Sequence, residues 1–112
     1  MTQTGIPVVA IVTFPANTSR SQAEMRSLLE EAGPAYVAIP GLRRKYFLHR
    51  AGVAGGVYEW ATRAQAEAFY DEAWYAAMSQ RSGSRPDVTL FESPAIADGI
   101  NQRLEIYLPV DA

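Results

Sequence analysis

The sequence has 112 residues, which suits one domain and is too short for two, so we expect a single domain over residues 1–112. Hydrophobic residues make up 48% of the chain and charged residues 20%, as in an ordinary globular protein, and the formal net charge is −2. This slight acidic excess argues against bulk binding to nucleic acid or to a membrane surface. The absence of cysteine excludes disulfides, iron–sulfur clusters and thiol catalysis, and the single histidine, His49, excludes a metal site built from several histidines of one chain.

The N-terminal residues MTQTGIPVV contain neither a basic region nor a long apolar run, so we expect no signal peptide. No stretch of about 18 apolar residues follows anywhere in the sequence, so no membrane-spanning segment is expected. These features predict a cytoplasmic protein with no membrane partner.

The first third of the chain reads as a strand followed by a helix. The β-branched run Pro7–Phe14 is typical of a buried strand. Ser21 and Glu24 form a possible capping box, and apolar residues at helical spacing follow it. Gly33-Pro34 either kinks this helix or restarts it with Pro34 in a first-turn position, and Pro40-Gly41 ends it.

A hairpin and a second helix occupy the middle of the chain. Leu42–Arg50 and Val57–Ala61 read as strands, joined by the glycine-rich turn Ala51–Gly56. Thr62 and Gln65 form a second possible capping box, which begins one continuous helix with an apolar face running to Ala77.

The last third is predicted to add a strand, an irregular stretch and a tail strand. A loop over Arg81–Pro86 precedes the strand Asp87–Glu92, and Ser93–Gly99 reads as irregular. In Arg103–Val110, apolar and polar residues alternate with a period of two, which is typical of a strand.

The resulting order β-α-β-β-α-β predicts an α+β, ferredoxin-like fold, in which two helices cover one face of an antiparallel sheet. A bare second face should be polar at every second position, yet Val8–Val12 is apolar at both parities. We therefore expect a second copy of the chain to cover that face, giving a homodimer, with the tail strand Arg103–Val110 at or near the interface.

Several of these features resemble one superfamily. Pro40-Gly41-Leu42 leads into an aromatic strand, Gly55–Trp60 begins the next strand before a capped, alanine-rich helix, and Val88–Glu92 follows. Together they resemble the dimeric α/β-barrel superfamily. Within it the chain is most similar to the YdhR-like monooxygenases, relatives of the antibiotic-biosynthesis monooxygenases. The shared motifs specify the shape of the fold and carry no catalytic group.

The resemblance implies a function. In such relatives a phenol, quinol or enol reacts with dioxygen without metal or flavin. The protein would then bind a small aromatic or polyketide-like substrate in a dry pocket, favour its anion and hold it still. No cofactor is expected on this basis.

Two side chains are candidates for the proton chemistry. His49 is the only side chain whose ordinary pKa lies near neutrality, and it lies late on its strand beside the glycine-rich turn. Tyr46, on the same strand, is the second catalytic candidate. The alternative for His49 is a rim or surface histidine without a role.

A set of aromatic residues is the candidate substrate-binding wall. Tyr58 and Trp60 share one parity of their strand, and Tyr70 and Trp74 are four apart on the second helix. If that strand face meets that helix, these residues and Tyr46 line one cavity. The alternative is an aromatic core or a dimer interface, where tyrosine and tryptophan are common.

The basic triplet Arg43-Arg44-Lys45 does not form part of a ribonucleoprotein signature, and we expect it to lie on a solvated strand face. Nucleophile elbows, phosphate-binding loops and metal-ligand spacings are also missing from the sequence. Two other functions stay open: a small-molecule-binding module without catalysis, and a haem-binding or haem-degrading relative with His49 as the axial ligand.

Overall fold

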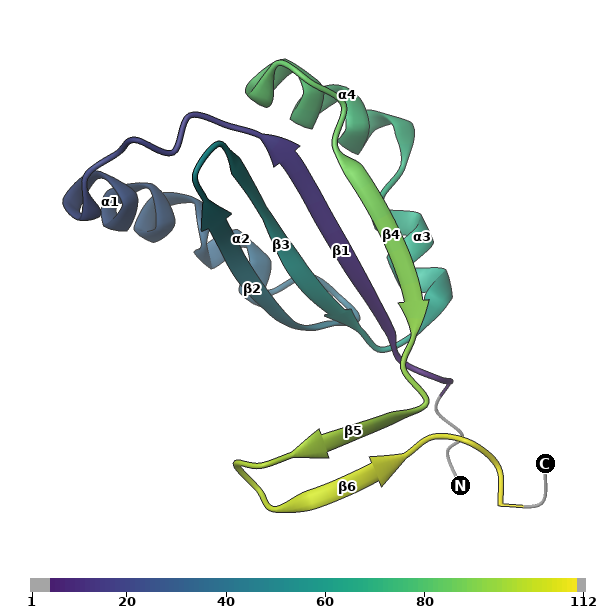
Figure 1. Cartoon of the computed structure of the whole chain (residues 1–112). Helices are drawn as coiled ribbons and strands as arrows, with labels where there is room; N and C mark the ends of the chain where they lie inside the picture. The colour runs from purple at the N-terminus through teal and green to yellow at the C-terminus, as the bar shows by residue number, and fades with distance from the viewer. Residues whose placement is uncertain (1–4, 111–112) are drawn as a thin grey trace.

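A computed structural model describes residues 5–110 as an α+β fold of the ferredoxin-like type (Figure 1). Its antiparallel sheet has the strand order β2-β3-β1-β4. The bounds of these strands are Val8–Pro15 for β1, Leu42–Arg50 for β2, Val53–Trp60 for β3 and Asp87–Glu92 for β4. The predicted fold class is therefore confirmed, and the bounds of β2 and β4 match the sequence prediction.

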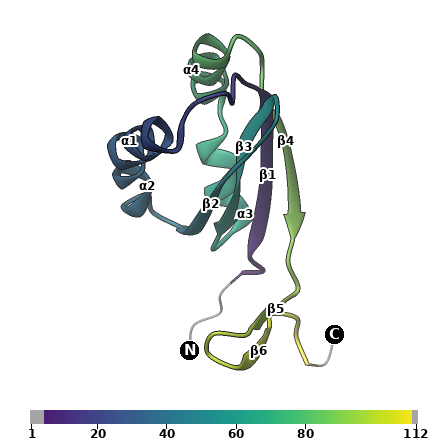
Figure 2. The same cartoon turned by 60° about the vertical axis from the view of Figure 1, so that its left-hand side comes forward.

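All the helices lie on one face of this sheet (Figure 2). Their bounds are Gln22–Ala32 for α1, Pro34–Val37 for α2, Arg63–Phe69 for α3 and Glu72–Ser82 for α4. The predicted capping box is present at the start of α1, where Ser21 Oγ accepts from the Glu24 amide at 3.1 Å. Pro34 restarts the chain as the first residue of α2, so the restart, and not a kink, is what the structure adopts.

The core lies between β1, β3 and α3. Its buried side chains come from alternate strand positions, from α3 and from the residue that ends α3, and they are Val8, Ala10, Val12, Tyr58, Trp60, Ala66 and Tyr70. No residue of α1 is buried, so that helix makes little packing contact with β2. The structure thus concentrates its packing under α3 and leaves the region beneath α1 more open.

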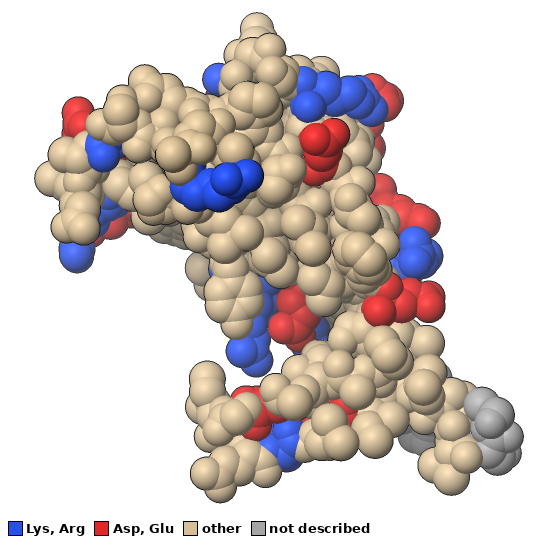
Figure 3. All heavy atoms as spheres, viewed as in Figure 1, with Lys and Arg blue, Asp and Glu red and all other residues tan. Residues whose placement is uncertain are grey.

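The opposite face of the sheet carries exposed apolar side chains. Its largest members are Ile11, Tyr46, Leu48 and Phe91, which are 40%, 55%, 43% and 52% exposed. The strand register places Ile11 and Tyr46 on either side of Val57, so they form a continuous apolar row. Figure 3 shows this face with few charged groups at its centre. We call it the open sheet face.

The hairpin between β2 and β3 is tighter than the sequence predicted. The glycine-rich segment Ala51–Gly56 was expected to be a loop, but only Ala51 and Gly52 form the turn, and β3 begins at Val53. Gly55 lets β1 and β3 approach closely, because a Cβ atom there would lie 1.9 Å from the carbonyl oxygen of Val12. Gly55 is therefore needed for the close contact between β1 and β3.

The predicted second helix is two helices. The chain breaks at Tyr70, and Asp71 begins α4 by accepting a hydrogen bond from the Trp74 amide at 2.8 Å. An aspartate N-cap satisfies a backbone N–H group that would otherwise lack a partner, and this makes a new helix start at Asp71 favourable.

The C-terminal segment forms a separate hairpin that projects from the domain (Figures 1 and 2). Its strands are β5, Ala95–Asp98, and β6, Arg103–Ile106. Two predictions are therefore corrected: Ser93–Gly99 is not irregular throughout, and the tail strand ends at Ile106 instead of Val110. Asp98 accepts bonds from the Ile100 and Asn101 amides, which explains the tight turn between the strands. The radius of gyration is 15.9 Å, larger than the roughly 13 Å of a compact chain this size, because the hairpin extends outward.

Candidate functional site

A one-residue irregularity in β2 decides which of its side chains face the helices. The register shifts between Leu42 and Arg44, so that Leu42 lies opposite Trp60 while Arg44 lies opposite Glu59. Beyond this bulge the two faces of the strand are exchanged. Lys45 then lies opposite Tyr58 on the helix face, and Tyr46 lies opposite Val57 on the open sheet face.

Tyr46 is consequently separated from the other candidate residues. It shares its face with Leu48, as predicted, but that face is the one without helices. The expectation that Tyr46 lines a cavity together with Tyr58 and Trp60 is therefore corrected, and the bulge at the start of β2 is the physical reason.

The remaining aromatic candidates do come together. Tyr58 and Trp60 stack with parallel rings 6.2 Å apart, and Tyr70 meets Trp74 edge to face at 4.9 Å across the break between α3 and α4. Phe69 joins them, 5.1 Å from Trp60. We call these five residues the aromatic cluster. Tyr58 and Trp60 are 3% and 1% exposed, so most of the cluster is packed core and only its margin is open to a ligand.

Two polar groups inside the aromatic cluster are joined by a hydrogen bond. Trp60 Nε1 donates a hydrogen bond to the Tyr70 hydroxyl at 3.1 Å. Burial raises the pKa of the Tyr58 and Tyr70 hydroxyls well above the ordinary value, so both stay protonated at any physiological pH. These tyrosines can therefore donate hydrogen bonds but cannot act as bases.

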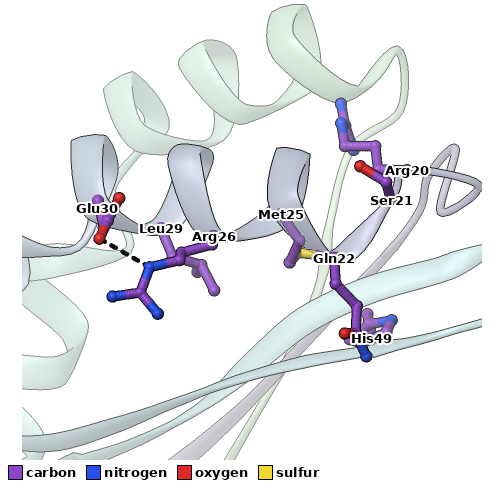
Figure 4. Close-up of a pocket in the computed structure, with 8 residues that line it drawn as sticks. All are labelled: Arg20, Ser21, Gln22, Met25, Arg26, Leu29, Glu30 and His49. Carbon is purple, nitrogen blue, oxygen red and sulfur yellow. Dashed lines mark hydrogen bonds and ion pairs between the residues drawn. The ribbon is translucent and has the colours of Figure 1, made fainter.

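His49 lines a groove between β2 and α1, which we call the α1 groove. It has a volume of about 480 Å³, and Figure 4 shows His49 on the strand below the first turn of the helix. The other lining side chains all come from α1 or the residues before it: Arg20, Ser21, Gln22, Met25, Arg26, Leu29 and Glu30. His49 is exposed, while Arg26 is paired with Glu30 at 3.0 Å. The histidine is thus accessible to a ligand and to solvent protons.

A second, smaller groove of about 220 Å³ lies beside α2, and we call it the α2 groove. Its lining residues are Gly33, Tyr36, Val37, Leu42, Arg43, Arg44, Lys45 and Phe47. The sequence predicted a solvated basic triplet here, which is wrong for Lys45: burial lowers its pKa from 10.5 to about 8. Arg43 and Arg44 remain exposed and pair with Glu59 at 3.4 and 3.5 Å. Nothing in the triplet itself signals this difference, because it arises from the bulge.

The described residues, 5–110, contain no group of three histidine, aspartate or glutamate side chains placed to hold a metal ion. Within the same range, no helix is both long and apolar enough to cross a membrane.

Comparison with known proteins shows the fold. No protein-family model and no curated protein sequence matches the chain. Among the solved structures that share its fold is a protein of unknown function from Nitrosomonas europaea, with a TM-score of 0.60, 20% identity, and coverage of 81% of this chain and 92% of that one. Another is SnoaB, a cofactor-independent oxygenase from Streptomyces nogalater solved as a mutant, with a TM-score of 0.53, 16% identity, and coverage of 80% and 94%.

At these identities the likeness establishes the ferredoxin-like fold alone, so membership of the YdhR-like group stays a prediction.

Proposed function

We propose that this protein is a cofactor-independent monooxygenase that oxidises a small aromatic, quinol or polyketide-like substrate with dioxygen. The observation that carries the proposal is the composition of one sheet face: an accessible histidine and a lysine of lowered pKa alternate with Phe47 on β2, next to the aromatic cluster. The fold shared with a cofactor-independent oxygenase supports the same reaction class.

This arrangement suits a reaction that starts from a substrate anion. Dioxygen reacts slowly with closed-shell molecules, but an electron-rich anion can pass an electron to it without a cofactor. For an anthrone, one such substrate class, the net change is C₁₄H₁₀O + O₂ → C₁₄H₈O₂ + H₂O. The protein's task is then to remove one proton, stabilise the resulting negative charge and exclude water.

His49 is our proposal for the residue that accepts the proton. It lines the α1 groove, and its exposed ring can pass the proton on to solvent. Tyr58, Trp60, Tyr70 and Trp74 are proposed to bind the substrate's rings at the open margin of the aromatic cluster. Tyr46, on the other face, is proposed to contribute to subunit contacts and not to the reaction.

We also propose that the chain works as a homodimer joined through the open sheet face. Ile11, Leu48 and Phe91 leave on that face an apolar surface of the kind that marks a protein–protein contact. The projecting hairpin carries more exposed apolar residues, including Leu104 and Ile106 at 62% and 64% exposure, and a second copy is the simplest partner for both surfaces.

Oxygen uptake tests the reaction class. Purified protein with a panel of quinols and anthrones should consume dioxygen faster than the buffer control, and His49→Ala should lower the rate about 10²- to 10³-fold. Uptake equal to background for both proteins, together with a ligand-induced rise in melting temperature, would instead establish a binding module. A Soret band on adding haem that disappears in His49→Ala would point to the haem-binding alternative.

A further inference from the structure

Lys45 lies on the same strand face as His49, but no step of the proposed reaction has yet been assigned to it. Its Nζ atom lies 3.5 Å from the centre of the Tyr36 ring, 4.0 Å from that of Phe47 and 4.6 Å from that of Tyr58. Gly56 makes room for this placement, because a Cβ atom there would lie 3.0 Å from Lys45 Cε. The fold therefore holds the lysine stem against the sheet and turns its amino group toward aromatic faces.

The amino group has no anionic partner of its own. None of the ion pairs found among residues 5–110 includes Lys45, although its neighbours Arg43 and Arg44 both pair with Glu59. Among the described residues that line the α2 groove, Arg43, Arg44 and Lys45 are cationic and none is acidic. A half-buried ammonium without a counter-ion is costly, and an anionic ligand would remove that cost.

We propose that the α2 groove is an anion subsite in which Lys45 holds the negatively charged oxygen of a planar, multi-ring hydroxyaromatic ligand. This rests on the proposed function for its biological substrate, but the binding step itself needs no oxidation. Tyr36 and Phe47 both line the groove, with their rings edge to face at 5.5 Å, and they offer the ligand an aromatic contact surface.

The spacing along β2 refines the substrate class. Lys45 and His49 are four residues apart on one strand face, so their Cα atoms are separated by about 13 Å. A ligand that engages both must lie along the strand over Phe47 and bear oxygen atoms at two separated positions. In a conjugated hydroxyaromatic ketone, a proton lost at the His49 end leaves a charge that delocalises to the oxygen at the Lys45 end.

Binding of a permanent anion tests the subsite without oxygen chemistry. Anthraquinone-2-sulfonate is planar, stays ionised at every pH used and cannot undergo the proposed oxidation, and quenching of tryptophan fluorescence reports its binding. Lys45→Met should weaken binding about 10- to 100-fold, whereas Lys45→Arg should retain it. Arg50→Met is the matched control, since it removes one exposed cation from the opposite face of the same strand.

The pH dependence adds a second readout. The titratable or charged groups around Lys45 are Tyr36 on α2, Tyr58 on β3 and the two arginines of the groove; Arg26 and Glu30 of α1 border the adjacent α1 groove. The burial that lowers the pKa of Lys45 to about 8 means that the ammonium is lost above that pH. Wild-type affinity should therefore fall as the pH rises through 8, and Lys45→Arg should stay flat.

Equal affinity of wild type and Lys45→Met, an equal loss in Arg50→Met, or no binding by wild type would overturn the subsite. Sulfonate binding with the expected lysine dependence but no oxygen uptake would keep the subsite and reject the oxygenase. Oxygen uptake that Lys45→Met leaves unchanged would keep the oxygenase and reject the subsite.

Discussion

Lys45 is the only lysine of the chain, and its partial burial should make the stability of the fold depend on pH. One pKa unit corresponds to about 1.4 kcal/mol, so a fall from 10.5 to about 8 sets an upper limit of about 3 kcal/mol. The lysine is only half-buried, and solvent screening reduces the expected effect to about 1–2 kcal/mol. The unfolded chain keeps the proton up to about pH 10.5, while the folded chain releases it near pH 8. Folding is therefore penalised below pH 8, and the penalty disappears as the pH rises from 8 to 10.5.

The assay is urea unfolding of wild type and Lys45→Met at a fixed protein concentration, from pH 7 to pH 10. The free energy of unfolding of wild type should increase relative to the variant by about 1–2 kcal/mol over this range. The difference in the free energy of unfolding between wild type and the control Arg50→Met should stay constant over this range, because that substitution leaves Lys45 in place. A difference between wild type and Lys45→Met that stays constant with pH would refute the assignment of Lys45 to a desolvated site.

Three further predictions concern packing, capping and assembly. Tyr70→Phe should lower the free energy of unfolding by about 1–3 kcal/mol in urea melts, because it leaves the buried Trp60 Nε1–H without its acceptor, whereas Tyr75→Phe should cost less. Asp71→Ala should cost about 1 kcal/mol and reduce helical circular dichroism by removing the N-cap of α4; unchanged melts would contradict that role. Sedimentation should show a dimer at micromolar concentration that Phe91→Asp or deletion after Asn101 weakens. Val37→Asp should leave it intact, because Val37 is the last residue of α2, on the other side of the sheet, and is 86% exposed. A wild-type monomer, or a dimer unaffected by both Phe91→Asp and the deletion, would reject the proposed interface.

The fold was predictable because its signals are local and independent of distant contacts. Strand β4 matches its predicted bounds, the Ser21 capping box is present, and Pro34 starts a new helix as its fixed backbone angle favours. The break at Asp71 was missed because apolar periodicity continues across it from Tyr70 to Trp74. An N-cap aspartate in the middle of an apolar run was the available signal.

The candidate site was harder to predict because one bulge controls it. A strict two-residue period from Leu42 would place Tyr46 on the helix face and Lys45 on the other, and the irregularity between Leu42 and Arg44 exchanges them. Nothing in the sequence marks that irregularity, since it depends on the pairing with β3. The strand β5 was missed for a related reason: it is stabilised by its partner β6 rather than by its own composition.

Incorporation of isotopic oxygen tests the proposed reaction most directly. Wild-type protein and an anthrone would be incubated under ¹⁸O₂, and the quinone product analysed by mass spectrometry. A monooxygenase places one atom of dioxygen in the product and the other in water, so the account predicts a product that is two mass units heavier and that forms faster than in the protein-free control and with His49→Ala. Labelled product formed at the same rate with and without the protein would contradict the account.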